Sequence, residues 1–468
     1  MGRTFHESRA SICSVCRKLL VADYTEDDSG LFLEKRCPEH GSMCTRVSAS
    51  YEWLAGLQSF AAHSFEPRAR QTAVSQGCPW DCGECPGHRQ RSAFFLFEIT
   101  DACDLNCPIC LGAPRERGSF VSVEDFERMA AAVVAYAGEG QLGTLGGGEP
   151  TLHPQLFRLV DVLRSQGFGG LFLYTNGRRI AREPELAVRL ADKGVCVVLQ
   201  WDGFNDSTYE SLRGRPLLEE KQRALAHLKA AGGPLGLCTT AVAGVNDREL
   251  GRIYSLFVSE AAFGLLDIAT MAFVGQGGTS DLGRDQRITS EDVVMALEAQ
   301  TSGALKASDF SPVSFSHPEC LQLAYLLAEP NSGFVPLRRI LDPEDYKRLI
   351  VDRPLLAVES DMEGTFREAI DRLWATPSSD PTRTRGLAAL RHLMETLFPR
   401  SGALSADEIK ARSAELVKVV LVHSYMDGLN FDVGRSKMCI SRTVLPDGRL
   451  VPTCAYNVIH RWDDCRRP

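Results

Sequence analysis

The sequence predicts an α/β fold in which parallel strands alternate with helices, flanked by cysteine-rich regions. Three observations predict it. Between residues 91 and 290, short apolar runs alternate with amphipathic segments at the spacing of β–α units. Each apolar run ends in polar or glycine-rich residues, and α/β barrels place ligand sites at that end of their strands. Half of the 16 cysteines stand in short C-x2-C or C-x3-C steps, which favour metal ligation over disulfides.

Length and charge exclude several other classes of protein. The 468 residues are too many for one ordinary core, so several domains are expected. The net charge of −8 gives no reason to expect a nucleic-acid partner. The apolar stretches are too short to cross a bilayer, and the N-terminus lacks the apolar core of a signal peptide. We therefore expect a cytoplasmic protein.

Residues 1–50 contain two cysteine-bearing knuckles separated by a short strand, Leu31–Lys35. Two knuckles at this separation are typical of a tetrahedral site for Zn or a single Fe, in a zinc-ribbon or rubredoxin-like fold. Its role is expected to be structural, because so small a region has little core of its own. The expected ligands are three thiolates and a fourth group that the sequence leaves open: Cys13, Cys16 and Cys37, with either His40 or Cys44.

A second cysteine motif follows an aromatic stretch, 51–75, that is expected to be helical. Cys78, Cys82 and Cys85 form a C-x3-C-x2-C pattern among proline and glycine turns. Three thiolates at this spacing favour an iron–sulfur cluster, with a structural zinc site as the alternative.

The next segment supplies the strands of the predicted α/β region. The expected strands are Ala93–Thr100, Gln141–Leu145, Gly170–Tyr174, Val195–Gln200, Leu235–Val242 and Leu265–Phe273. Ser122 is the expected N-cap of the first intervening helix, and Pro184 opens a later one. Residues 291–400 are expected to be mostly helical, and 405–426 to form a further helix.

The most informative motif follows the first strand directly. Cys103, Cys107 and Cys110 form another C-x3-C-x2-C pattern. Three thiolates bind three irons of a cubane and leave the fourth iron open, which we expect to hold S-adenosylmethionine. Gly146–Pro150, Gly-Gly-Gly-Glu-Pro, ends the next strand, and its backbone and Glu149 can bind the amino group of an amino acid. The stretch lacks the Gly-Lys-Ser/Thr of a P-loop, so a nucleoside triphosphatase is not expected.

These two motifs in a β–α pattern resemble the radical S-adenosylmethionine (radical SAM) superfamily over about 91–290. The resemblance implies a partial (β/α)6 TIM-like barrel, a 4Fe–4S cluster on Cys103, Cys107 and Cys110, and reductive cleavage of S-adenosylmethionine. The resulting 5′-deoxyadenosyl radical would remove hydrogen from the substrate. By position, the resemblance implies these cofactor contacts: Gly146, Gly147, Gly148, Glu149, Pro150, Thr175, Asn176, Gln200 and Asp202.

A narrower resemblance extends over nearly the whole chain. It is to the group of archaeal tetraether lipid synthases and cobalamin-independent dihydropterin methylases. The motifs that carry it are Cys13/Cys16, 37–41, 77–88, 98–110, 200–203, 244–247, 317–320, 430–432, Cys439, 446–449 and Cys454. The group implies bond formation at unactivated carbon and makes Cys320, Cys439 and Cys454 ligands of one or two auxiliary 4Fe–4S clusters, beside Cys78, Cys82 and Cys85.

Four segments are therefore expected. They are a rubredoxin-like or zinc-ribbon site (1–50), an auxiliary-cluster segment (51–90), the radical SAM barrel (91–290) and a helical cap with a C-terminal auxiliary-cluster domain (291–468). Further candidates for the polar lining of the site are Tyr209, Arg213, His317, His423, Asp427 and Asn430.

The expected activity is C–C bond formation, by lipid-chain coupling or by methylation. The alternatives are a radical dehydratase or other modification of a small secondary metabolite, and a non-catalytic iron–sulfur carrier. A carrier would not need Gly-Gly-Gly-Glu-Pro at a strand end. The expected partners are a small-molecule or lipid substrate and a reductant such as flavodoxin or ferredoxin, with peripheral membrane contact if the substrate is a lipid.

Overall fold

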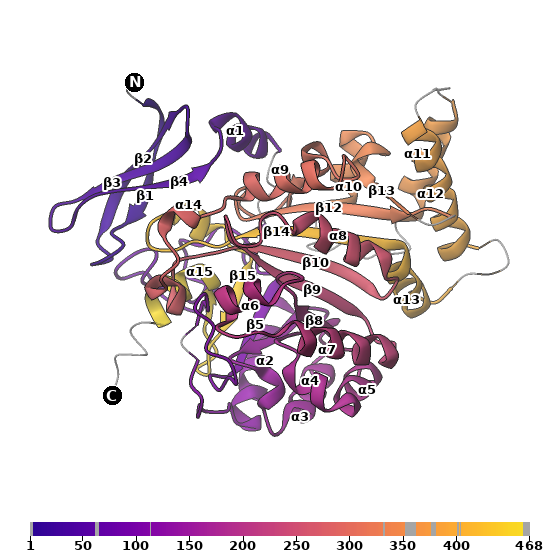
Figure 1. The fold of residues 1–468 in the computed structure, drawn as a ribbon, viewed down its shortest axis with the longest axis horizontal. Helices are drawn as coiled ribbons and strands as arrows, with labels where there is room; N and C mark the ends of the chain where they lie inside the picture. Colours follow the sequence, from indigo (N-terminus) through magenta and orange to yellow (C-terminus); the bar gives the residue numbers. More distant parts are fainter. Residues whose placement is uncertain are drawn as a thin grey trace.

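The chain folds around one large sheet, with a separate small sheet at its N-terminus (Figure 1). The computed structural model describes residues 3–60, 65–112, 114–330, 333–351, 362–375, 381–399, 402 and 404–461. In Figure 1 the small sheet lies at the upper left, and the helices within residues 123–192 and 218–231 lie below the large sheet.

Six parallel strands in chain order form the barrel. They are β5 (Phe94–Thr100), β6 (Leu142–Gly147), β7 (Gly170–Thr175), β8 (Cys196–Gln200), β9 (Leu235–Ala241) and β10 (Phe263–Thr270). The helices between them are α2 (Val123–Ala137), α3 (Leu156–Ser165), α4 (Arg178–Arg182), α5 (Pro184–Asp192), α6 (Asp206–Arg213), α7 (Leu218–Ala231) and α8 (Leu250–Ser259). The α/β class and the partial barrel expected from the sequence are confirmed.

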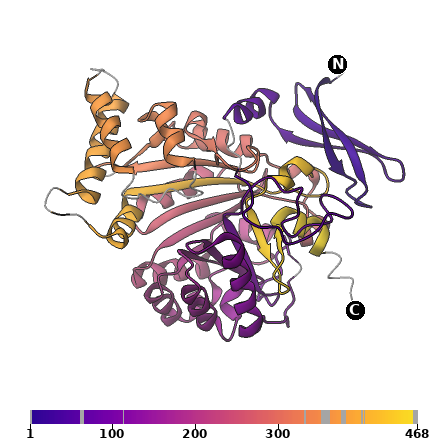
Figure 2. The same cartoon turned by 180° about the vertical axis from the view of Figure 1, so that it is seen from behind.

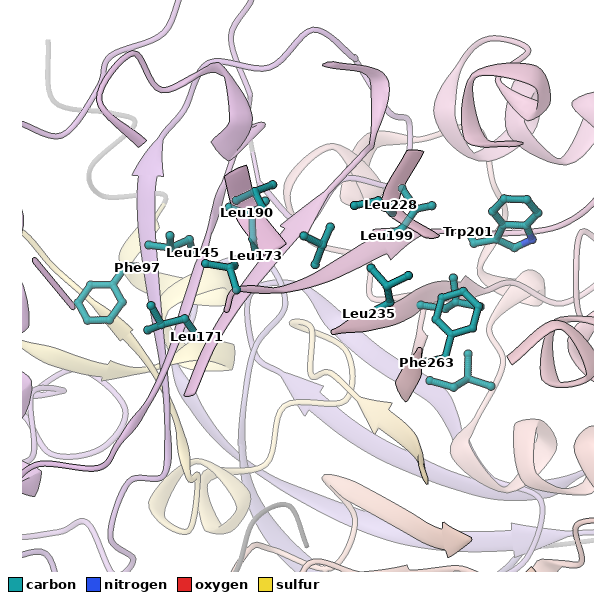
Figure 3. Packing of buried hydrophobic residues seen from close by; sticks show 14 of the residues in the cluster. Phe97, Leu145, Leu171, Leu173, Leu190, Leu199, Trp201, Leu228, Leu235 and Phe263 are labelled. Atoms are coloured by element: carbon teal, nitrogen blue, oxygen red, sulfur yellow. The ribbon is translucent and has the colours of Figure 1, made fainter. Parts of the chain in front are cut away.

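The outward-facing side chains of these strands pack against the helices. Figure 3 shows Leu145, Leu173 and Leu199 from successive strands lying close together in one apolar layer. Each fully buried side chain of this kind contributes about 1.5–3 kcal/mol. Ser122 caps α2 as expected, since its side chain accepts a hydrogen bond from the backbone N–H of Asp125.

The C-terminal region extends this sheet at both edges. Strand β14 (Val417–Ser424) pairs in parallel with β10, and β15 (Ser441–Val444) pairs in parallel with β5. Beyond them lie antiparallel strands: β12 (Leu321–Ala328) beside β14, then β11 (Ser311–Pro312) and β13 (Phe334–Pro336), and β16 (Leu450–Pro452) beside β15. The described parallel strands thus run without interruption from β15 through the barrel to β14.

Two sequence predictions in this region are wrong. The helix expected over 405–426 ends at Leu416 as α13 (Ala406–Leu416), and β14 begins at the next residue. Val417, Val419, Val420 and Val422 are β-branched and favour an extended backbone buried between neighbouring strands. Strand β12 interrupts a region that was expected to be mostly helical, since its uniformly apolar run does not distinguish strand from helix.

The inner face of the barrel shares a core with the C-terminal helices. These are α10 (Pro343–Ile350), α11 (Glu363–Ala375) and α12 (Pro381–Leu397), preceded by α9 (Ser290–Gln300). Buried residues of β12 and β14 pack with side chains of α10, α11 and α12 and with inward residues of the barrel. Figure 2 shows this helical region at one end of the sheet, opposite the N-terminal sheet. None of the described helices carries an apolar stretch long enough to cross a membrane.

The N-terminal sheet is antiparallel and docks on C-terminal segments. Its strands are β1 (Thr4–Ile12), β2 (Leu19–Asp27), β3 (Gly30–Cys37) and β4 (Gly41–Ser48). Ser11 donates a hydrogen bond to the carbonyl of Phe431 at 2.5 Å, and Lys35 donates to that of Gly428 at 2.9 Å. Arg46 forms an ion pair with Asp292 of α9 at 2.6 Å.

The helical stretch expected over 51–75 is shorter than predicted. Helix α1 spans Tyr51–Ser59, and residues 65–75 form no helix. Pro67 cannot continue a helix, and it also biases Glu66 toward an extended backbone. Short helical elements complete the fold: Pro150–Leu152, Gly275–Thr279, Arg284–Gln286, Ala307–Asp309, Leu337–Arg339, α14 (Val433–Lys437), α15 (Thr453–Ala455) and the π-helix Tyr456–His460.

Candidate active site and metal centres

A cavity of about 370 Å³ opens at the C-terminal ends of the barrel strands and extends into the barrel. It is lined by the three thiols of the cysteine loop, Cys103, Cys107 and Cys110. Of the residues expected to contact the cofactor, the following also line it: Gly146, Gly147, Gly148, Glu149, Thr175, Asn176 and Gln200. The ends of four neighbouring strands thus bring the two sequence motifs to one site.

The glycine loop holds the cysteine loop in place. The N–H of Gly148 donates to the carbonyl of Thr100, and the N–H of Glu149 donates to that of Ala102, both at 2.7 Å. A Cβ atom on Gly148 would lie 2.1 Å from the carbonyl oxygen of Ala102. Gly147 has a φ of +115°, which favours glycine. Both glycines are therefore needed for the two loops to meet.

The three thiols are buried but are not gathered around a single point. Burial raises the pKa of the Cys103 thiol to about 12 and also raises the pKa of Cys110. Cluster binding requires thiolates, so loading this site would release protons. The sulfur atoms do not all lie within 4.8 Å of one another, unlike the ligand atoms of the N-terminal site. This wider spacing suits a cluster in which each thiolate binds a different iron.

Glu149 is buried beneath the glycine loop and held by several donors. Its carboxylate accepts hydrogen bonds from the Thr175 hydroxyl and from the N–H of Asn176, both at 2.7 Å. Thr151 donates to it through its N–H and its hydroxyl. Burial raises the pKa of Glu149, although these hydrogen bonds oppose the shift. The carboxylate thus ties the ends of β6 and β7 together at the cavity wall.

Asp202 and Pro150, which were expected to contact the cofactor, do not line the cavity. Asp202 is fully buried behind Arg213, which lines the cavity and donates to both oxygens of Asp202 at 2.7 and 2.9 Å. Pro150 opens the short helix that follows the glycine loop. Lys221, which sequence reasoning missed, is buried beneath Gln200 and donates to its side-chain oxygen. Burial lowers the pKa of Lys221 to about 8.

Of the other candidates for the polar lining, Arg213 and His423 line the cavity and four do not. The Tyr209 hydroxyl donates to the carbonyl of Gly203, and Asp427 pairs with Arg287 at 2.5 Å. Asn430 accepts from the N–H of Asp427, and His317 lies beside Arg9. These four side chains lie in structural contacts because their loops pack against neighbouring segments instead of opening into the barrel.

The structure adds lining residues that the sequence did not single out. Arg461 pairs with Glu98 at 3.0 Å, beside the cysteine loop. Inside the barrel the cavity reaches Tyr174, Cys238 and Asp267. The signal for Asp267 was available, since it is the one acid in the apolar run 265–269.

The remaining cysteines line two further cavities. One is bordered by Cys78, Cys82 and Cys85, together with Ser436 and Lys437. The other is bordered by Cys320, Cys439 and Cys454, together with His423 and Tyr425. His423 and Tyr425 also line the central cavity, so the second cysteine group adjoins it directly.

A buried ion pair joins the loops that carry these cysteines. Arg442 of β15 pairs with Glu84, which lies between Cys82 and Cys85. Both side chains are fully buried. Arg442 also donates to the carbonyl of Cys439 at 2.7 Å. The loop that carries Cys78, Cys82 and Cys85 is thus fixed to the C-terminal tail.

The N-terminal sheet carries a compact four-ligand group. The ligand atoms of Cys13, Cys16, Cys37 and His40 all lie within 4.8 Å of one another. The sulfurs of Cys16 and Cys37 are 3.8 Å apart, and His40 Nδ1 lies 3.5 Å from the Cys37 sulfur. Zn–S and Zn–N bonds of about 2.3 and 2.0 Å in a tetrahedron give separations of about 3.8 and 3.5 Å. Within the described residues no other set of three such side chains is this compact.

Cys44, the alternative fourth ligand, lies outside this group. It is exposed on β4, opposite Glu34 of β3, and Arg3 donates to its sulfur at 3.0 Å. His40 stands in the hairpin between β3 and β4, next to Cys37, whereas β4 carries Cys44 away from the knuckles. The four-thiolate alternative therefore does not fit this structure.

Comparisons with known proteins agree with this organisation. The family model for the Radical SAM superfamily matches residues 97–257, and that for the HMPTM N-terminal zinc ribbon domain matches residues 5–49. A 7,8-dihydro-6-hydroxymethylpterin dimethyltransferase of Methanocaldococcus jannaschii is 28% identical over 484 aligned positions, covering 97% of this chain and 94% of that protein.

Other similarities are confined to part of the chain. The mycofactocin maturase MftC of Mycobacterium tuberculosis is 34% identical over 145 residues, 29% of this chain and 34% of that protein. Streptococcus suis SuiB bound to S-adenosylmethionine aligns in structure with a TM-score of 0.37 and 15% identity, over 46% of this chain and 48% of that one. With the cysteine and glycine loops meeting at one cavity, and with these sequence matches, the chain is an enzyme that carries a radical SAM domain at residues 97–257 and a zinc ribbon domain at residues 5–49.

Proposed function

We propose that this radical SAM enzyme forms a C–C bond at an unactivated carbon of a small polar molecule, and that the reaction is methylation of a reduced pterin. The observation that carries the proposal is the similarity to a dihydropterin dimethyltransferase along 97% of the chain, from the zinc ribbon to the tail. The cavity supports it, because its inner end carries hydroxyl, carboxylate and imidazole groups from Tyr174, Asp267 and His423. A lipid chain would leave the buried Oδ1 of Asp267 without a hydrogen-bond donor.

In this proposal Cys103, Cys107 and Cys110 hold the 4Fe–4S cluster at the mouth of the cavity. When bound, that cluster and S-adenosylmethionine supply the electron and the 5′-deoxyadenosyl radical that removes hydrogen from the substrate. The residues present fit these groups, since the three thiols share the cavity with a glycine loop whose backbone no Cβ atom obstructs.

The cofactor contacts expected from the sequence divide into two roles in this proposal. The glycine loop from Gly146 to Gly148, with Thr175, Asn176 and Gln200, borders the space that S-adenosylmethionine would occupy. Glu149 fixes the ends of β6 and β7 and presents its carboxylate to the amino group of the cofactor. Asp202 and Pro150 do not line the cavity and act through neighbouring residues. Asp202 orients the Arg213 guanidinium, and Pro150 shapes the turn after the glycine loop.

We further propose two auxiliary 4Fe–4S clusters, one on Cys78, Cys82 and Cys85 and the other on Cys320, Cys439 and Cys454. Support comes from the separate cavities that the two cysteine groups line. The thiols of each group are too widely spaced for a single ion. The second cluster would lie behind His423 and Tyr425, at the edge of the substrate cavity, where it can exchange electrons with a bound substrate.

The zinc ribbon is proposed to hold one Zn or Fe on Cys13, Cys16, Cys37 and His40. The division of the chain into the four segments expected from the sequence is likewise part of the proposal. Enzymes of this superfamily need a reductant, and we propose a flavodoxin or a ferredoxin. The proposed location is the cytoplasm, because many free thiols and reduced clusters require a reducing compartment.

Detection of a methylated pterin product tests this proposal. The protein is reconstituted anaerobically with iron and sulfide and then reduced. It is incubated with S-adenosylmethionine, with a set of one-carbon donors to supply the methyl carbon, and with 6-hydroxymethyl-7,8-dihydropterin. The proposal predicts a pterin whose mass rises by one or two methyl groups, detected by mass spectrometry. If S-adenosylmethionine is cleaved and the pterin stays unmodified, methylation of this substrate class is wrong, while the superfamily chemistry stands.

A further inference from the structure

One carboxylate at the inner end of the cavity, Asp267, has not yet been given a specific role. Asp267 lies in the middle of β10, in register with Cys238 of β9, and lines the central cavity. Its neighbours along the strand, Leu265, Leu266 and Ile268, are buried and apolar. Only 5% of the Asp267 surface is exposed, so water reaches it through the cavity alone. Structural carboxylates this deeply buried normally have a cation or several donors as partners.

The hydrogen bonding of Asp267 is incomplete. The Tyr174 hydroxyl donates to Oδ2 at 2.9 Å, whereas Oδ1 is buried and has no partner. Among the described residues that line the cavity, Asp267 is the only one with such an atom. Rotation about its last torsion, which has a broad minimum, can turn either oxygen to the cavity. A buried acceptor without a donor is costly, so these atoms generally have a purpose.

Among the described residues that line the cavity, none forms an ion pair with this carboxylate. Two described cations line the cavity: Arg213 is paired with Asp202, and Arg461 is paired with Glu98. Burial raises the pKa values of Tyr174, Tyr425 and Cys238, so these groups stay uncharged near pH 7. Burial lowers the pKa of His423 to about 3, so it also stays neutral. Burial raises the pKa of Asp267 only to about 6, which leaves it ionised at pH 7.5.

We propose that Asp267 is a substrate-binding residue whose carboxylate accepts a hydrogen bond from a ring N–H or amino group of a planar heterocycle bound in the cavity. The inference rests on the proposed function and deepens it by naming the group that recognises the polar edge of the substrate. A planar ring suits the surroundings, because His423 and Tyr425 stack at 3.9 Å and border the same cavity. Pterins present amino and ring N–H donors along one edge, whereas an alkyl chain presents none.

The position of Asp267 also gives the substrate a direction. The cysteine loop lies at the C-terminal ends of the strands, and Asp267 lies below them, in the barrel interior. A ring anchored by its N–H edge at Asp267 therefore directs its opposite edge toward the cysteine loop. This places the carbon that loses hydrogen near the site where the radical is generated.

The experiment measures binding and needs no turnover. Reconstituted holoenzyme with S-adenosylmethionine and no reductant is titrated with 6-hydroxymethyl-7,8-dihydropterin, followed by the fluorescence of the pterin. Wild type is compared with Asp267→Asn, which keeps the size and the Tyr174 contact and removes the charge. Asp161→Asn, on the exposed face of α3, is the matched control. We expect Asp267→Asn to weaken pterin binding at least about tenfold, as for the loss of a hydrogen bond to a charged group.

Two controls separate recognition from folding and from the reaction. Binding of S-adenosylmethionine by Asp267→Asn should be unchanged, which shows that the barrel is intact. If that variant does not fold, wild type still provides a test, because its affinity for the pterin should fall between pH 7.5 and 5.5 as Asp267 is protonated. Tyr174, Cys238, Tyr425 and His423, which face Asp267 or border the same cavity, keep one protonation state over that range.

Equal pterin affinities for wild type and Asp267→Asn would overturn the inference, as would the absence of pterin binding to a wild type that binds S-adenosylmethionine. Failure of the proposed function is a separate result, since it is seen as unmodified pterin after turnover. A protein that binds the pterin through Asp267 and does not methylate it would keep this inference and refute the reaction.

Discussion

Substitution of Glu84 tests whether the buried ion pair with Arg442 holds the two auxiliary-cluster loops together. Glu84→Gln keeps the size and the acceptor oxygen of the side chain and removes its charge. The Arg442 guanidinium is fully buried, and its other contacts are carbonyl oxygens, such as that of Cys439 at 2.7 Å, and the ring of His88. The variant therefore leaves a buried cation without a counter-charge.

The expected cost follows from this burial. Removal of one partner from a buried pair costs about 3–5 kcal/mol, and the retained hydrogen bond places Glu84→Gln near the lower end, at about 3 kcal/mol. For unfolding of the whole 468-residue chain, with an unfolding entropy of about 2.1 cal/mol/K per residue, that corresponds to a fall in melting temperature of about 3 °C. Near-ultraviolet circular dichroism of the anaerobic protein measures the melting temperature, and iron analysis measures cluster retention.

The tail offers a matched control in Asp447→Asn. Asp447 pairs with Arg449 at 2.7 Å, but their side chains are 54% and 43% exposed. Exposed pairs contribute about 0–1 kcal/mol, so this variant should melt within about 1 °C of wild type. Equal melting temperatures for Glu84→Gln and wild type would refute the reasoning, because the buried pair would then make no net contribution.

Three further predictions concern the ribbon, the barrel interior and the glycine loop. His40→Ala should lose most of the metal bound to the ribbon and Cys44→Ser should keep it, as measured by metal analysis of the separate variants; the reverse pattern would restore the four-thiolate site. Burial raises the pKa of Asp267 to about 6, so the native state holds the proton of this carboxyl group more tightly than the unfolded chain does. The free energy of unfolding therefore falls as the pH rises from about 4 to 6. Asp267→Asn should remove this loss and melt above wild type at pH 7.5, and an unchanged melting temperature would contradict the assignment. Gly148→Ala should displace the cysteine loop and lower 5′-deoxyadenosine formation at least about 100-fold, whereas Gly264→Ala, where a Cβ atom meets nothing within 4 Å, should match wild type.

The barrel was predicted well because each of its strands is indicated by a pattern within a short stretch of sequence. The six strands follow from apolar runs that end in polar or glycine residues, and their bounds differ from the structure by a few residues at most. The zinc-ribbon knuckles follow from spacing, since two residues between ligands bring them to one ion. That His40 and not Cys44 lies beside the three thiols depends on the hairpin geometry of β3 and β4, which spacing alone does not give.

Features that depend on tertiary pairing could not be predicted from the sequence. Val417–Ser424 has helix formers before it and apolar residues throughout, and only its place beside β10 makes it a strand. The division of the auxiliary cysteines likewise depends on which loops pack together, because Cys320, Cys439 and Cys454 are far apart in sequence. Asp267 shows the opposite case: an acid in an apolar strand was visible in the sequence, but its missing partner was not.

The central claim is that Cys103, Cys107 and Cys110 generate a radical from S-adenosylmethionine. The most direct measurement is 5′-deoxyadenosine, quantified by liquid chromatography after anaerobic reconstitution and incubation with dithionite and S-adenosylmethionine. Wild type should form it, and a variant with all three cysteines changed to alanine should form none while keeping the ribbon metal and the iron of the auxiliary sites. A fully loaded wild type that forms no 5′-deoxyadenosine, or a triple variant that forms as much as wild type, would contradict the account.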